Sequence, residues 1–159
     1  GDDKIAWYEN DGAESFTERV ISTSADKAWV VYAKDVDGDG DMDVLSASLA
    51  DSKIAWYEND GAESFTERVI PSSGIFPKTL YAEDVDKDGD IDVISAFFNS
   101  NMIVWYENDG AENFTENIIT DSSTLTDVCF QNNCSIRVAV TCNYNIICSS
   151  NRNIICSIH

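Results

Sequence analysis

The chain repeats itself every 49 residues, and this period constrains its fold more than any other feature. Residues 4–21 return unchanged as residues 53–70, and they return again as residues 102–119 with five substitutions. A period of this size is typical of propellers, solenoids and arrays, in which each unit buries its apolar face against its neighbours. The unit of folding is therefore expected to be the repeat.

Each repeat contains four short segments with the composition of strands. In the first full repeat these segments are residues 29–33, 44–48, 54–57 and 65–70. In the second they are residues 79–82, 93–98, 103–106 and 114–119. No window has a sustained 3.6-residue apolar period, so we expect no helix of consequence. Four strands in a repeat of this length favour antiparallel β-propeller blades.

The phase of the repeat divides the region 1–121 unequally. It predicts half a blade at residues 4–21, followed by full blades at 27–70 and 76–119. Since propellers generally close with four to eight blades, we expect an all-β, incomplete propeller that is a piece of a longer array. The exposed strand edges of an open array favour association with further blades of the same kind.

The composition changes abruptly after Asp121. Residues 122–159 hold all five cysteines but only one of the 29 acidic residues. Three interpretations stay open for this Cys-rich tail: an out-of-frame translation, a degenerate blade, or a disulfide-bonded cap. An odd number of cysteines would leave at least one thiol unpaired in an oxidising compartment. A zinc site is disfavoured because the tail has no Cys-x-x-Cys pair.

Two acidic segments, residues 35–43 and 84–92, carry aspartate at every second position. Like charges this close repel one another, so a compact loop of this composition is expected to bind a hard divalent cation. Ligands that are all oxygens favour calcium over zinc or copper. The expected ligands of the two calcium ions are Asp35, Asp37, Asp39, Asp41 and Asp43, and Asp84, Asp86, Asp88, Asp90 and Asp92.

The spacing indicates how each aspartate would serve. Positions 1, 3 and 5 direct side chains toward one centre, and the glycine at position 6 allows a sharp bend. Position 7 would offer its backbone carbonyl, and position 9 would close the ligand shell. An EF-hand shares the first six positions but needs a glutamate at position 12 and flanking helices. Position 12 is Ser46 or Ser95 and the flanks are strands, so we reject an EF-hand and a dockerin-like module.

Two other interpretations of the acidic segments need no bound metal. One is a solvated acidic turn, which the exact recurrence of five alternating carboxylates disfavours. The other is a catalytic carboxylate pair. Acid–base chemistry requires two carboxyl groups whose pKa values are pushed apart, whereas these groups are equivalent and mutually repelling.

The acidic segment, the following Ile-Ala-Trp-Tyr-Glu-Asn and a closing phenylalanine together resemble FG-GAP repeats of the VCBS type. That family includes the propeller of integrin α subunits and many secreted microbial proteins. The resemblance covers residues 1 to about 121. It implies a seven-bladed propeller in the full protein, calcium in the loop joining the first two strands of a blade, and an extracellular or cell-surface location. It also implies that the ten aspartates above are the metal ligands.

Charge and composition narrow the function. A net charge of −19 opposes binding to nucleic acid and to anionic membranes. No apolar run approaches the ~20 residues of a membrane-spanning helix. Residues 1–121 contain no histidine or cysteine and no nucleophile–base pair, so we expect no enzymatic activity. We expect a recognition or adhesion scaffold whose partner is an extracellular protein or glycan. The alternatives are a lectin-like propeller and a non-catalytic part of a secreted polysaccharide-degrading enzyme.

Two smaller patterns concern carbohydrate, one as a bound ligand and the other as a covalent modification. Trp7, Trp56 and Trp105 stand in register and could stack on sugars, but their alternation with isoleucine on a buried strand favours packing between blades. Asn113-Phe-Thr115 and Asn133-Cys-Ser135 match the acceptor sequence for N-glycosylation, a short motif that also occurs by chance.

Overall fold

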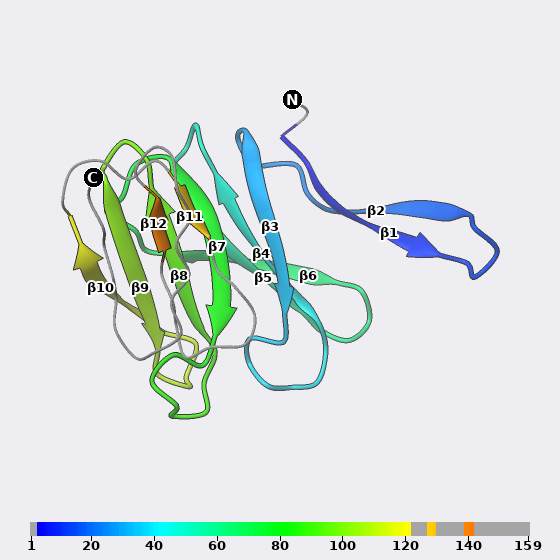
Figure 1. Cartoon of the computed structure of the whole chain (residues 1–159). Coiled ribbons are helices and arrows are strands. Elements are labelled where there is room, and N and C mark those ends of the chain that lie inside the picture. The colour runs from blue at the N-terminus through cyan, green and yellow to red at the C-terminus, as the bar shows by residue number, and fades with distance from the viewer. Residues whose placement is uncertain (1–2, 122–126, 130–138, 142–159) are drawn as a thin grey trace.

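The computed structural model describes residues 3–121, 127–129 and 139–141. The elements in these ranges are all strands, and they pair into antiparallel sheets (Figure 1). The expectation of an all-β chain with four-stranded antiparallel sheets is confirmed. The described ranges contain no helix that could cross a membrane.

Two sheets have four strands each, and in both the strand order follows the chain order. The first blade consists of β3 (Ala28–Lys34), β4 (Asp43–Ser48), β5 (Ile54–Asn59) and β6 (Phe65–Ile70). The second blade consists of β7 (Pro77–Glu83), β8 (Asp92–Phe97), β9 (Met102–Asn108) and β10 (Phe114–Thr120). Because every strand pairs with its neighbour in sequence, each blade is assembled entirely from local hairpins.

A two-stranded sheet precedes the first blade and contains β1 (Ile5–Asn10) and β2 (Phe16–Ser22). These strands have the sequence of β5 and β6, and from Ala6 to Asn10 they pair in the same register, with Trp7 opposite Arg19 as Trp56 is opposite Arg68. The register shifts only at Ile5, which lies opposite Ser22. Identical sequences thus form the same hairpin in two settings.

The region after Asp121 is described only in part. Two short strands, β11 (Asp127–Cys129) and β12 (Ala139–Thr141), pair antiparallel. The cysteines other than Cys129 lie outside the described residues. The three interpretations of the tail therefore stay open.

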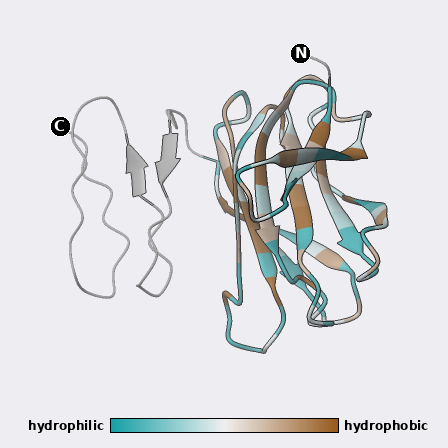
Figure 2. Ribbon diagram, turned by 90° about the vertical axis from the view of Figure 1, so that its right-hand side faces the viewer, coloured by the Kyte–Doolittle hydropathy of each residue, from teal (hydrophilic) through white to brown (hydrophobic). Residues whose placement is uncertain are grey.

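The main core lies between the two blades. It joins buried residues of the first blade, such as Leu45, Ile54 and Trp56, to buried residues of the second, such as Val93 and Tyr106. Figure 2 shows the apolar positions concentrated along the strands, with hydrophilic loops at the ends of the sheets. Each blade thus buries an apolar face against its neighbour, as the repeat period predicts.

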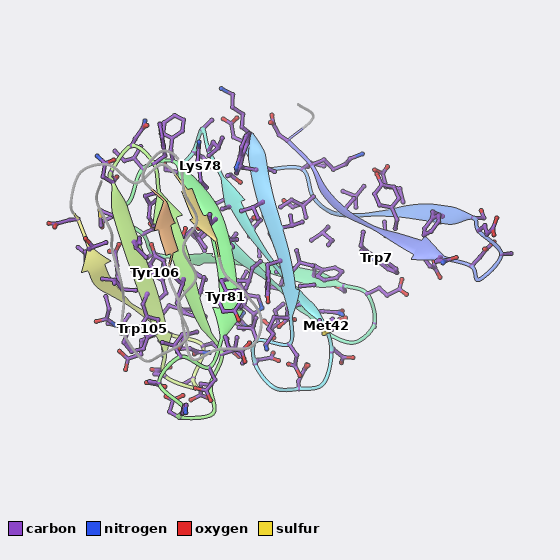
Figure 3. All side chains as sticks on the ribbon, viewed as in Figure 1. Trp7, Met42, Lys78, Tyr81, Trp105 and Tyr106 are labelled. Atoms are coloured by element: carbon purple, nitrogen blue, oxygen red, sulfur yellow. The ribbon has the colours of Figure 1, made fainter. Side chains whose placement is uncertain are left out.

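Aromatic side chains mark the contact between the blades. Tyr32 meets Tyr81, which is labelled in Figure 3, edge to face with ring centroids 5.9 Å apart. Trp56 meets Phe114 in the same manner, with centroids 6.4 Å apart. Trp56 is completely buried, and the Arg68 guanidinium lies 5.3 Å from the centroid of its ring. This environment agrees with packing, and it leaves no face of Trp56 open to a sugar.

A second, smaller core attaches the β1–β2 hairpin to the first blade. Ile5 and Ala25 are buried together with Ala55 and Tyr57 of β5. The Lys53 ammonium donates to the Ser24 carbonyl at 3.0 Å and to Glu67 at 2.7 Å. The hairpin is therefore held by both apolar packing and a charged hydrogen bond.

Candidate metal centres

The acidic segments form the connections from β3 to β4 and from β7 to β8. Both connections lie at the same end of the sheets (Figure 1). The two loops thus hold equivalent places in their blades, between the first strand and the second.

In each loop the structure brings together the carboxylates of positions 1, 3 and 5. Oxygens of Asp35, Asp37 and Asp39 all lie within 4.8 Å of one another, and so do oxygens of Asp84, Asp86 and Asp88. The first residue of each group is half-buried and the other two are exposed. The alternate spacing in the sequence is therefore converted into a cluster of three carboxylates.

Backbone N–H groups of the loop itself hold this cluster in place. Asp35 accepts from Gly38 at 2.8 Å and from Gly40 at 3.1 Å, one on each oxygen. Asp37 Oδ1 accepts from the Asp39 N–H at 3.2 Å, and Asp39 Oδ1 from the Asp41 N–H at 2.8 Å. These bonds use one oxygen each of Asp37 and Asp39, so the second oxygen of each can face a cation.

The second loop repeats this pattern bond for bond. Asp84 accepts from the backbone N–H of Lys87 at 2.7 Å and from that of Gly89 at 3.3 Å. The Asp88 N–H donates to Asp86 at 3.2 Å, and the Asp90 N–H donates to Asp88 at 2.9 Å. The two loops differ at two positions: Lys87 replaces Gly38, and Ile91 replaces Met42. Lys87 has the same left-handed backbone as Gly38, with φ of 71° against 77°. The second loop therefore carries one extra positive charge in a conformation that suits glycine.

The glycine at position 6 makes the bend that the spacing predicts. Gly40 and Gly89 have φ values of 98° and 107°, which side-chain-bearing residues rarely adopt. Because their N–H groups donate to Asp35 and Asp84, the bend also brings the chain back toward position 1.

The carboxylates of position 9 lie outside the three-carboxylate clusters. Asp43 is completely buried, and its oxygens accept from the Val36 N–H at 3.0 Å and the Asn59 N–H at 2.8 Å. Asp92 does the same with Val85 and Asn108, at 3.0 and 2.9 Å. These carboxylates connect the start of the loop to the end of the third strand. Their expected role in closing the ligand shell stays a prediction.

The side chains of position 7 point toward the neighbouring hairpin turn. A methyl group on Gly61 would lie 2.4 Å from Asp41 Oδ2, and one on Gly110 would lie 2.6 Å from Asp90 Oδ2. Glycine at these turns thus leaves room for the carboxylates. That position 7 offers a backbone carbonyl to the metal stays a prediction.

The electrostatics of the loops reflect the crowding of negative charge. Partial loss of hydration raises the pKa of Asp37, although the Asp39 N–H opposes the shift, and the carboxylates of Asp43, Asp39 and Asp35 raise this pKa further. Burial also raises the pKa of Asp43 and of Asp92, although the backbone N–H donors oppose this shift. The buried indole N–H of Trp56 also favours the charged form of Asp43, and that of Trp105 favours the charged form of Asp92. Neither indole N–H makes a hydrogen bond of ordinary geometry. A divalent cation would offset the repulsion among these groups.

The donor set fits a hard cation. Three carboxylates converge in each loop, and no nitrogen or sulfur ligand joins either group in the described part of the chain. Calcium is bound by six to eight oxygens in flexible geometry, whereas zinc favours nitrogen and sulfur. Asp35, Asp37 and Asp39 could hold one such ion, and Asp84, Asp86 and Asp88 another.

A search among curated proteins finds no match to this chain. A family model described as an FG-GAP-like repeat matches residues 1–46 and 35–95. The two matches together span residues 1–95, which is more than half of the chain, and they include both acidic loops. The chain therefore belongs to the FG-GAP-like repeat family and is a β-propeller-type repeat module.

Proposed function

We propose that each acidic loop binds one calcium ion and that these ions stabilise the blades without taking part in a chemical reaction. The observation that carries this proposal is the convergence of three carboxylates in both loops, held by the same backbone hydrogen bonds. The two loops share every aspartate and the glycine at position 6, so both copies of the repeat offer the same three carboxylates to a cation.

The expected gain in stability is modest for each site but large for the module. Extracellular calcium modules bind with dissociation constants of about 10⁻⁴–10⁻³ M. At ~1 mM calcium and a Kd of ~0.1 mM, ligation adds roughly 1.4 kcal/mol to the free energy of unfolding per site. Two sites together then supply a substantial part of the ~5–15 kcal/mol typical of a folded domain.

The proposed setting is extracellular or at the cell surface, where the module acts as a recognition or adhesion scaffold for a protein or a glycan. Sites of this weakness are occupied only where calcium is near-millimolar, which favours the outside of the cell. The high negative charge keeps nucleic acids and anionic membranes from competing as partners.

Calorimetric titration of the full chain with calcium, together with melting curves of variants, tests the metal sites. Asp39→Ala and Asp88→Ala should each lower the melting temperature in calcium and change it little in EGTA. Glu14→Gln is the matched control, since it removes an exposed acidic charge outside both loops. An equal loss in both buffers, or a titration without heat, would refute metal ligation.

Arrays of extracellular proteins and of glycans, probed with the full chain, test the recognition role. Binding that requires calcium is the expected result. Turnover of any polysaccharide by the chain would contradict the non-catalytic role.

A further inference from the structure

Three hairpin turns of the described region have the same structure, built by the same hydrogen bonds. In each, an aspartate N–H donates to the carbonyl of the residue four positions later at 3.1 Å. In each, the same aspartate's Oδ1 accepts from the N–H of that later residue, at 3.2, 3.1 and 3.2 Å. The aspartates are Asp11, Asp60 and Asp109.

The third turn differs from the other two at one position that changes its chemistry. The later residue is Ser15 and Ser64 in the first two turns and Asn113 in the third, and phenylalanine and threonine follow in all three. Only the third turn therefore carries the Asn-x-Ser/Thr acceptor sequence for N-glycosylation. Asn113 and Thr115 are both exposed, at the turn from β9 to β10.

We propose that Asn113 is an N-glycosylation site. This inference rests on the extracellular location in the proposed function, because the modification occurs in the secretory pathway. The co-substrate is an oligosaccharide linked to a polyprenyl pyrophosphate. The Asn113 amide nitrogen forms a bond to the anomeric carbon and loses one proton, while the bond from that carbon to the pyrophosphate oxygen breaks and the lipid pyrophosphate departs with the electron pair.

The turn can carry a glycan without losing its structure. The Asn113 amide donates to Asp109 Oδ2 at 3.0 Å, to Asp109 Oδ1 at 3.3 Å and to the Ala111 carbonyl at 3.1 Å. A glycosylated amide keeps one N–H, so one of these contacts can persist. The two other turns have serine, Ser15 or Ser64, at this position and keep the same aspartate bonds, so these bonds do not require an asparagine side chain there.

The position of the site gives the glycan a physical role. β10 is the edge strand of the second blade in the described sheet, and edge strands offer unpaired backbone groups to other chains. A bulky, hydrated oligosaccharide at the start of β10 would hinder edge-to-edge pairing of this blade with another molecule.

The repeats supply matched variants for the test. The full chain, fused to a secretion leader and produced in eukaryotic cells, would be compared with Asn113→Ser, which installs the residue found in the two other turns. Ser64→Asn creates the same Asn-Phe-Thr acceptor sequence in the equivalent turn of the first blade. Peptide mapping after peptide N-glycosidase treatment identifies each site, because the enzyme leaves aspartate where the glycan was attached. The mapping also separates Asn113 from the acceptor sequence at Asn133.

The expected result is a glycan at Asn113 in the parent chain, none there in Asn113→Ser, and an additional one in Ser64→Asn. A secreted parent chain with unmodified Asn113 would overturn the inference. If the Ser64→Asn chain were then modified only at its new acceptor, the obstacle would lie in the third turn itself. Calcium titration of the same samples keeps the two proposals apart. Heat without a glycan defeats this inference alone, and a glycan without heat defeats calcium binding alone.

Discussion

Replacing Asp43 by alanine should destabilise the first blade whether or not calcium is present. The Asp43 carboxylate is completely buried and accepts the N–H groups of Val36 and Asn59. Alanine would leave the buried Val36 N–H and the half-buried Asn59 N–H without this acceptor, at roughly 1–3 kcal/mol for each unsatisfied donor. The raised pKa of Asp43 indicates that its negative charge is unfavourable there, so removing this charge offsets part of the cost. We expect a net loss of about 3 kcal/mol in the free energy of unfolding.

Urea denaturation followed by tryptophan fluorescence, in EGTA and in calcium, measures this effect. Asp37→Ala is the matched comparison, because Asp37 is exposed and accepts one loop N–H at 3.2 Å. In EGTA, Asp37→Ala should cost at most about 1 kcal/mol, since exposed hydrogen bonds contribute little net stability. Asp43→Asn, which keeps one acceptor oxygen, should fall between the two.

A loss for Asp43→Ala that appears only in calcium would refute the structural role and make Asp43 a metal ligand. A loss in EGTA no larger than that of Asp37→Ala would show that the Val36 and Asn59 N–H groups find other partners. Either result would overturn the distinction between the cluster and the buried carboxylate.

Two further predictions concern single charged groups. Lys87→Gly should increase the calcium affinity of the second loop several-fold, because it removes a positive charge beside the carboxylates. Gly38→Lys should lower the calcium affinity of the first loop, because it adds such a charge. Calorimetric titrations in which the variants bind calcium with the affinity of the parent chain would contradict this. The Ala111 N–H, and then the Asn113 side chain, hold the pKa of Asp109 below its ordinary value near 3.8. The contribution of Asp109 to stability is therefore complete above that ordinary value and is lost as the pH falls through the lower folded value. An NMR titration should show the lowered pKa moving upward in Asn113→Ser, and an unchanged value would count against the contact.

Much of the fold could be predicted because the repeat reports the same information several times. The segment 65–70 is β6 (Phe65–Ile70) without adjustment, while β7 begins at Pro77 rather than at residue 79. Apolar pattern alone misses such ends, since polar and proline residues at the edge of a sheet still pair. Pro77 lies opposite Phe97 in the register, on an edge strand where a missing N–H is tolerated.

The convergence of positions 1, 3 and 5 and the bend at position 6 could be predicted from the spacing, whereas the ligand roles of positions 7 and 9 stay predictions. Asp35, Asp37 and Asp39 converge because the chain there coils as a loop. By position 9 the chain has entered β4, where alternate residues share one face of the sheet. Asp43 is therefore buried on the face of Leu45 and Ala47. The period-2 pattern was the available signal that Asp43 lies on the buried face of β4. The N–H groups that donate to Asp43 could not be inferred from spacing, because one of them, that of Asn59, belongs to a distant segment.

The identity of the β1–β2 and β5–β6 hairpins gives the folding chain two equivalent partners for β4. Residues 49–53 connect β4 to β5, whereas residues 11–42 separate β4 from β1. Loop closure alone then favours the local partner by roughly 1.6 kcal/mol. Faithful assembly of this tandem array thus depends on tether length as well as on side-chain chemistry, and a lengthened 49–53 connection would let the wrong copy compete.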